Sequence, residues 1–160
     1  MNEQDVTLRV PDLLDAVELA ELHVAVWLST YGHRLPKSHF DSAAVQRREK
    51  MWSIILRNCD PSTSLVVAEH AGALVGFAHA GNPFEKLPAR PLQLHSLYVA
   101  DGYREFGTGQ RLLDYVVADR RAQLWVADEN ERARKFYERN RFRADGTRAA
   151  DLLPEIRMAR

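Results

Sequence analysis

The sequence predicts a single α/β layered domain that spans residues 1–160. Three observations support this fold class. The length suits one hydrophobic core. A content of 46% hydrophobic and 28% charged residues is that of a globular chain. Segments with alternating apolar side chains interleave with segments of helical periodicity, in the order strand, two helices, three strands, helix, strand, helix and two strands.

The first third of the chain predicts one strand followed by two helices. Residues 6–10 alternate as in a half-buried strand. Asp15 and Glu18 have the spacing of a capping box, which predicts a helix that begins there. Asp41 or Ser42 can cap the second helix. The first helix is expected to bury a single apolar stripe, made of Val17, Ala20, Val24, Trp27 and Tyr31.

The middle of the chain predicts three consecutive strands. Residues 64–69 and 74–79 are rich in strand-forming side chains, and Ala71 and Gly72 between them indicate a hairpin. Residues 91–99 alternate and predict the third strand. Strict alternation places its side chains in two sets on opposite faces, with Leu92, Leu94, Ser96 and Tyr98 on one and Gln93, His95, Leu97 and Val99 on the other.

The last third predicts two further helices around a strand. Residues 109–121 carry a helical apolar stripe, and residues 123–127 form an apolar strand. Asn130 can cap the following helix. Two strands, from residue 142 onward and over 154–158, close the chain. The solvent-exposed face of the last helix is expected to hold two ion pairs, Glu131 with Lys135 and Arg134 with Glu138.

A glycine-containing loop carries the strongest chemical signal. Residues 104–109 read R-x-x-G-x-G and lie between a strand and a helix. Gly107 and Gly109 lack a Cβ, so a ligand can approach the backbone closely. The first N–H groups of a helix have no intrahelical partner and favour an anion. The spacing is neither the dinucleotide-binding nor the P-loop pattern. Taken alone, the loop could also be a plain tight turn.

Two segments in the right order resolve that ambiguity. Residues 103–113, YREFGTGQRLL, resemble motif A of the GNAT superfamily of N-acetyltransferases, and residues 124–142, LWVADENERARKFYERNRF, are similar to its motif B. The helix with Trp27 and Tyr31 and the strand over 154–158 also resemble the family, so the resemblance covers the whole chain. It implies a mixed central sheet of about seven strands flanked by about four helices, with acetyl-CoA as the acetyl donor and CoA as a product.

The resemblance also implies roles for particular residues. Backbone groups of Leu97, Tyr98 and Val99 would pair with the pantetheine amides as an added strand. Backbone amides of the loop would hold the pyrophosphate, from Arg104, Glu105, Phe106, Gly107, Thr108, Gly109 and Gln110. Residues of the fourth helix would line the thioester end and the adenine-side wall, namely Asn130, Ala133, Phe136 and Tyr137. One or two arginines of that basic helix would meet the 3′-phosphate.

Two departures from the family pattern are visible. Glu105 and Phe106 stand where the family often has Gly or Arg, so a negative charge lies near the expected phosphates. Arg141 stands where Gly is usual, at a position that favours the left-handed conformation. Asn140 could adopt that conformation in its place.

The implied reaction is direct attack of a primary amine on the acetyl thioester. The Val99 N–H is the candidate donor to the oxyanion, and Tyr137 is the candidate acid for the leaving thiolate. Tyr137 could alternatively be a packing aromatic. His95 is the candidate base, with a structural histidine as the alternative, and Glu69 and His79 are weaker candidates. The acceptor pocket would be rimmed by the first helix, residues 32–36 and residues 82–85, with Trp27, Tyr31 and Phe84 available to hold a cation.

Composition limits the remaining function classes. Lysine plus arginine equals aspartate plus glutamate at 22, so bulk attraction to nucleic acid or to an anionic membrane is not expected. No histidine pattern indicates a metal site. Residues 1–5 lack the features of a signal peptide, and Cys59 is the single cysteine, so a cytoplasmic location is expected.

The sequence leaves the substrate and the assembly open. The acceptor could be a small-molecule or a protein amine, and the chain could be a monomer or a homodimer. The alternative function is a catalytically silent acyl-CoA-binding module that serves sensing or assembly. Such a module would keep the glycine loop and dispense with Tyr137 and a base.

Overall fold

The computed structural model describes residues 5–58 and 60–160, and it contains the predicted order of elements. Residues 1–4 and Cys59 lie outside the described residues, and so do the expectations about a leader segment and about the Cys59 thiol. The strands are β1 (Thr7–Arg9), β2 (Ser64–His70), β3 (Ala73–Gly81), β4 (Leu92–Val99), β5 (Ala122–Ala127), β6 (Arg143–Ala150) and β7 (Pro154–Ala159). The helices are α1 (Ala16–Tyr31), α2 (Ser42–Arg57), α3 (Thr108–Val116) and α4 (Glu131–Arg139).

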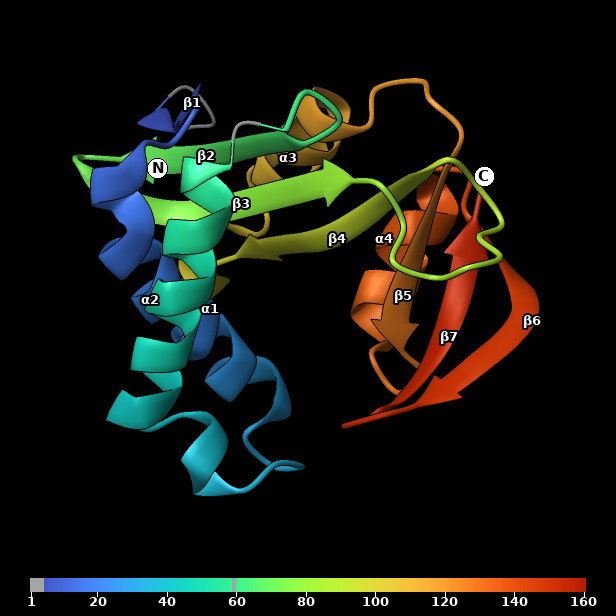
Figure 1. The fold of residues 1–160 in the computed structure, drawn as a ribbon, viewed down its shortest axis with the longest axis horizontal. Coiled ribbons are helices and arrows are strands. Elements are labelled where there is room, and N and C mark those ends of the chain that lie inside the picture. Colours follow the sequence, from blue (N-terminus) through green and yellow to red (C-terminus); the bar gives the residue numbers. More distant parts are fainter. Residues whose placement is uncertain (1–4, 59) are drawn as a thin grey trace.

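One mixed sheet with the strand order β1-β2-β3-β4-β5-β7-β6 runs through the molecule. The β4–β5 pair is parallel and the other neighbouring pairs are antiparallel. Helices α1 and α2 cover one face of the first four strands, and α3 covers the other (Figure 1). The α/β fold with about seven strands and about four helices is therefore confirmed.

Strands β4 and β5 separate soon after they meet. Their parallel pairing covers only three residues of each strand, from Leu92 opposite Ala122 to Leu94 opposite Leu124. Figure 1 shows the two strands together near their beginnings and diverging toward their ends. The remainder of β4 therefore has one edge without a neighbouring strand. This open edge is the feature that positions the site.

A β-bulge in β4 overturns the expected alternation of that strand. The β3–β4 register shifts between His79 and Ala80, so that Ser96 pairs with His79 but Leu94 pairs with Ala80. The extra residue, His95, reverses the faces that follow it. Leu94 consequently packs in the same core cluster as Leu97 and Val99, and His95 does not share their face. The prediction that Leu92 and Leu94 lie opposite Leu97 and Val99 was wrong.

The N-terminal capping box lies three residues earlier than predicted. Asp12 accepts a hydrogen bond from the Leu14 N–H at 2.7 Å, and Asp15 Oδ2 accepts one from the Asp12 N–H at 2.8 Å. Asp15 also accepts two hydrogen bonds from the Arg9 guanidinium, both at 2.8 Å. The predicted partner, Glu18, instead accepts the Leu74 N–H of β3 at 2.7 Å. The Arg9–Asp15 pair explains the shift, because it engages the carboxylate in the turn before α1.

The other helix ends differ in how well they were predicted. Asp41 caps α2 through the Ala44 N–H at 2.9 Å, and Asn130 caps α4 through the Ala133 N–H at 3.1 Å. Both caps were expected. Helix α3 ends at Val116 rather than near residue 121, because Ala118 has a left-handed φ of 50°.

Three expectations about side chains on helices needed correction. Val17 was placed in the buried stripe of α1 but is 47% exposed. Arg134 pairs with Asp128 at 2.9 Å rather than with Glu138, whereas the expected Glu131–Lys135 contact is present at 3.7 Å. After α4, Arg141 itself adopts the left-handed conformation, with a φ of 69°, and the alternative at Asn140 is wrong because its φ is −93°.

Candidate active site

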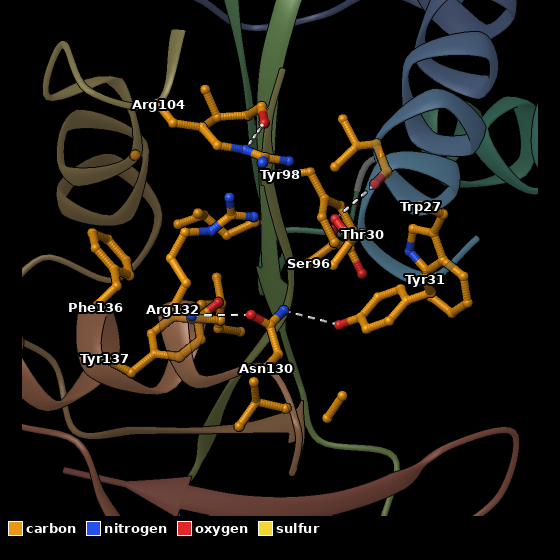
Figure 2. A pocket seen from close by; sticks show the side chains of 18 of the residues that line it. Trp27, Thr30, Tyr31, Ser96, Tyr98, Arg104, Asn130, Arg132, Phe136 and Tyr137 are labelled. Carbon is orange, nitrogen blue, oxygen red and sulfur yellow. Dashed lines mark hydrogen bonds between the residues drawn. The ribbon is translucent and has the colours of Figure 1, made fainter. Parts of the chain in front are cut away.

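The open edge of β4 forms one wall of a cleft with a volume of about 830 Å³. Helices α1 and α4, strand β5 and the loop before α3 supply the other walls (Figure 2). Most of the predicted site residues line this cleft, namely His95, Leu97, Tyr98, Val99, Arg104, Glu105, Gly107, Gly109, Gln110, Asn130, Ala133, Phe136 and Tyr137. Phe106 and Thr108 do not line it, although they belong to the same loop.

The glycines of the loop before α3 leave its backbone open to the cleft. Gly107 precedes the helix with a left-handed φ of 72°, a conformation that other residues adopt at a cost. Thr108 is fully buried, and its hydroxyl has no hydrogen-bond partner among the described residues. A Cβ on Gly109 would lie 3.8 Å from the Phe136 ring, so this glycine leaves the wall open beside α4. The unpaired N–H groups at the start of α3 can therefore meet an anion.

Arginines add positive charge near this loop. Arg104 Nε donates a hydrogen bond to the Val99 carbonyl at 2.8 Å, and its guanidinium also pairs with Asp101. Burial lowers the pKa of Arg104, and the neighbouring Arg132 lowers it further. Arg132 and Arg139 line the cleft as well. Glu105, whose charge was expected to oppose a phosphate, is exposed to solvent.

The ladder of β3 and β4 determines which β4 backbone groups are available. The Ala100 N–H donates to the Val75 carbonyl at 2.9 Å, next to the Val99–Gly76 pair. Because ladder bonds alternate along an antiparallel strand, the N–H groups of Leu97 and Val99 point away from β3 into the gap. The backbone of Tyr98 faces β3, and Tyr98 contributes its ring to the cleft.

Asn130 links the two sides of the cleft. Its Oδ1 caps α4, and its Nδ2 donates a hydrogen bond to the Tyr31 hydroxyl of α1 at 3.1 Å (Figure 2). Burial raises the pKa of the Tyr31 phenol, which is a neutral acceptor for this bond. The two helices are thereby fixed relative to each other at the bottom of the cleft.

Tyr137 lies on the cleft side of α4 and is 8% exposed. Its ring contacts those of Phe136 and Phe142, with centroids 5.4 Å and 5.9 Å away. Burial raises the pKa of its phenol, and the phenols of Tyr98 and Tyr31 raise it further. Tyr137 therefore keeps its proton at neutral pH and can donate it within the cleft. The packing role and the chemical role are compatible in this geometry.

His95 sits at the bulge, stacked on Phe84 with ring centroids 4.5 Å apart and near His79 at 5.0 Å. Burial lowers the pKa of His95. It also lowers the pKa of His79 to about 4, with a further contribution from His95. Both rings are accordingly neutral at pH 7. Glu69, the other weak candidate for a base, is paired with Arg9 at 2.7 Å and does not line the cleft.

The loop that carries Phe84 is anchored by the next residue. Glu85 Oε1 accepts hydrogen bonds from Trp125 Nε1 at 2.7 Å and from Gln123 Nε2 at 2.6 Å. Its other oxygen accepts from Arg157 at 2.8 Å. The expected rim loop is thus fastened to β5 and β7, and this holds Phe84 over His95.

Glu155 is a cleft residue that the sequence reasoning missed. It is the second residue of β7, pairs in register with Ala127 of β5, and lines the cleft. Burial raises the pKa of its carboxyl, and nearby Asp151 raises it further. A glutamate next to the apolar residues of the closing strand was the available signal, but only the strand order shows that it faces the cleft.

Comparison with known proteins decides the family. The model of the acetyltransferase (GNAT) family matches residues 20–142, which is more than half of the chain. The chain belongs to the GNAT acetyltransferase family. A probable N-acetyltransferase, Rv2775, of Mycobacterium tuberculosis is 28% identical over 155 residues, which cover 91% of this chain and 84% of the relative. As a GNAT protein the chain is an acyltransferase.

Solved GNAT structures share the fold. The PaiA N-acetyltransferase of Thermoplasma acidophilum, solved in complex with coenzyme A, superposes with a TM-score of 0.75 at 19% identity, over 97% of this chain and 98% of that one. An acetyltransferase of Corynebacterium glutamicum described as histone acetyltransferase HPA2 and related acetyltransferase gives a TM-score of 0.71 at 18% identity, over 97% and 95%. These likenesses support the strand arrangement around the cleft.

The described residues contain neither an arrangement suited to a metal ion nor a helix suited to spanning a bilayer. Over residues 5–58 and 60–160, no group of three or more His, Cys, Asp or Glu side chains is arranged to hold a metal ion. Within those ranges, no helix has the length and apolar character needed to span a bilayer. Most of the predicted site residues line the cleft beside β4.

Proposed function

We propose that this GNAT protein transfers an acetyl group from acetyl-CoA to a primary amine by direct attack. One observation carries the proposal: the open edge of β4 and the N-terminus of α3 border the same cleft. The edge offers backbone groups of Leu97 and Val99 to the pantetheine amides. The helix start at Gly107 offers N–H groups to the pyrophosphate. A site for a small anion would need the start of α3 but not the open edge of β4, whereas a CoA-like donor would use both.

The remaining charges fit a CoA-like donor. Arg104, Arg132 and Arg139 line the cleft near the loop, where phosphate groups would be placed. Glu105 is exposed, so its charge is screened by solvent and costs less than a buried one would. The solved complex of the Thermoplasma acidophilum relative with coenzyme A supports the same choice of donor.

The chemistry needs three functions from the protein. The amine nitrogen bonds to the acetyl carbon, the carbon–sulfur bond breaks, the amine loses a proton and the thiolate gains one. The Val99 N–H, which points into the gap, is the proposed donor to the developing oxyanion. Tyr137, which is protonated at neutral pH and lines the cleft, is the proposed acid for the thiolate.

Two groups compete for the role of base. His95 lines the cleft, but its lowered pKa makes it a weak acceptor for a proton from an ammonium group. Glu155 also lines the cleft, and its raised pKa makes it a stronger base than an exposed carboxylate. The shifts bring the basicities of the two groups closer together, so Glu155 becomes a candidate beside His95. The sequence-based proposal of His95 is retained as the alternative.

Turnover distinguishes this function from a silent acyl-CoA-binding module. The purified protein is mixed with acetyl-CoA and a panel of primary amines, and free CoA thiol and acetylated product are measured together. We expect stoichiometric thiol and acetyl-amine for at least one class of amine. Tight acetyl-CoA binding without thiol release across the panel would support the silent module.

A further inference from the structure

A second hollow adjoins the cleft on the side of α2, with a volume of about 920 Å³, and is called the side pocket here. Its walls and those of the cleft share Trp27, His95, Tyr98 and Glu155, so the two spaces lie side by side. The side pocket therefore reaches the point where an acceptor would approach. Apolar side chains form much of its lining, including Met51, Trp52, Ile55, Phe84 and Trp125.

Arg48 of α2 is a cation in this lining that lacks a carboxylate partner. Its guanidinium lies over the Trp27 ring, 5.3 Å from the centroid, and its Nη1 contacts Met51 Sδ at 3.9 Å. Within the described part of the chain, no carboxylate lies at ion-pair distance from Arg48, which is half-buried. A half-buried cation without a counter-ion is costly, and an anionic ligand would offset that cost.

The opposite wall of the side pocket is acidic. Asp151 and Glu155 line it, next to the start of β7. Tyr98 also lines the side pocket, and both Arg48 and Glu155 act electrostatically on its phenol. Arg48 and Glu155 do not pair with each other. Arg47 and Lys50 add positive charge on the α2 side. The side pocket is thus positive at one end, negative at the other and apolar between.

We propose that the side pocket holds an acceptor that carries a carboxylate and a primary amine at opposite ends of an apolar body. Arg48 binds the carboxylate, and Glu155, at the junction with the cleft, receives the ammonium group. Trp27 and Trp125, which are partly exposed in the side pocket, contact the body of the molecule. This inference rests on the proposed function. It disfavours polyamines, because a second cation would face Arg48.

Ligand binding without turnover gives the first test. The probe is 3-phenylpropionate, an apolar carboxylate without an amine, titrated by calorimetry into the full chain saturated with CoA. The variant is Arg48→Gln, and Arg57→Gln is the matched control, since Arg57 is an exposed arginine on the same helix and outside the side pocket. We expect affinity to fall at least about tenfold in Arg48→Gln and to stay unchanged in Arg57→Gln.

Turnover gives the second test. Linear amino carboxylates of increasing length, beginning with 5-aminovalerate, are each compared with the matching carboxamide. We expect the wild type to favour the carboxylate by at least about tenfold in kcat/KM for the best pair. Arg48→Gln should reduce this ratio to about threefold or less, and Arg48→Lys should retain part of it. Near-UV circular dichroism and acetyl-CoA affinity verify that each variant keeps its fold.

The outcomes separate this inference from the proposed function. Acetylation of amines with no preference for carboxylates, or a preference that survives Arg48→Gln, would overturn the inference and leave the acetyltransferase function standing. Arg48-dependent binding of 3-phenylpropionate without turnover of any amine would support the anion site and contradict amine acetylation. Failure of the probe to bind the wild type, or equal binding to Arg48→Gln, would also overturn the inference.

Discussion

The Asn130 amide donates a hydrogen bond to the Tyr31 hydroxyl at 3.1 Å, and this bond joins two helices that lie on opposite sides of the cleft. The same side chain caps α4 through its oxygen. Asn130 therefore stabilises one helix and fixes its position relative to another. A residue that was expected only to cap and to line the site also sets the width of the cleft.

Loss of the Asn130 side chain should lower the free energy of unfolding through two contributions that can be measured separately. Asn130→Ala loses a cap worth about 1 kcal/mol and a hydrogen bond worth about 0.5–1.5 kcal/mol. Tyr31→Phe loses the bond alone. Urea unfolding of both single variants and the double variant measures the coupling. Asp41→Ala, which removes only the cap of α2, is the control for capping. Additive effects within about 0.3 kcal/mol would show that the bond contributes nothing.

Tyr137→Phe should separate packing from acid catalysis. The ring and its contacts remain, so acetyl-CoA affinity and thermal stability should change little. The kcat should fall about 10²–10⁴-fold if the hydroxyl protonates the leaving thiolate. Tyr115→Phe is the control, because Tyr115 is 48% exposed and lies outside the cleft. A kcat for Tyr137→Phe within about threefold of wild type, with chemistry rate-limiting, would argue against the acid role.

Gly107→Val should weaken acetyl-CoA binding more than it weakens the fold. Valine at a φ of 72° is strained by about 1–2 kcal/mol and places branched carbons beside the expected phosphates. Gly146→Val supplies the matched control, since Gly146 has a φ of 89°, has open space around a Cβ and does not line the cleft. Both variants should lose similar stability, and only Gly107→Val should lose affinity by calorimetry. Equal affinity in the two folded variants would remove the pyrophosphate site from this loop.

The two candidate bases should respond differently to removal. Glu155→Gln should reduce kcat/KM by about 10²-fold or more, whereas His95→Gln should change it by less than about threefold. Because the pKa of Glu155 is raised, wild-type kcat/KM should rise with pH as this carboxyl ionises, and Glu155→Gln should lose that acidic limb. The reverse pattern, with the loss confined to His95→Gln, would assign the base to the histidine.

Acid should destabilise the protein through His23. This ring is 5% exposed among the rings of Phe77 and Tyr98, and burial, assisted by Arg48, lowers its pKa from 6.5 to about 3. Between these values the unfolded chain binds the proton and the folded chain does not. The free energy of unfolding therefore falls as the pH drops below about 6.5, by up to about 1.4 kcal/mol per pH unit.

Replacing His23 with a ring that cannot be protonated should weaken the pH dependence of the unfolding free energy. His23→Phe, followed by urea unfolding at several pH values, should lose less stability than the wild type as the pH falls from about 6.5. The exposed His33, changed to Gln, serves as the control. Parallel stability curves for His23→Phe and the wild type would show that His23 does not control acid sensitivity.

Local patterns predicted the elements of this fold, because helix periodicity, caps and turn residues act over a few positions. Asn130 was recognised as a cap from its neighbours alone, and Asp41 was one of two candidates together with Ser42. The bulge at His95 was not recognised, since it depends on how β4 aligns with β3. The capping box was placed at Asp15 rather than Asp12, because Arg9 is brought to Asp15 by the path of the chain after β1.

The candidate site shows the same division. The glycine loop and the fourth helix were identified from motifs, and the cleft contains most of their residues. Arg48 carries no local signal, because an arginine on an amphipathic helix is an ordinary surface residue in sequence, and the local signal of Glu155 does not show which space it faces. Only the packing of α2 beside Trp27 and the position of β7 beside β5 bring them to one pocket.

The short parallel contact between β4 and β5 has a mechanical consequence. Only three residues of each strand are paired, so strands β1–β4 and strands β5–β7 form two parts of the sheet with a short connection between them. A donor that occupies the gap as an extra strand would bridge these two parts of the sheet. Occupancy at one hundred times the dissociation constant adds about 2.7 kcal/mol to the unfolding free energy of any such protein. For this chain, that gain would arise where the pairing between neighbouring strands is shortest. The bound donor would then complete the sheet reversibly.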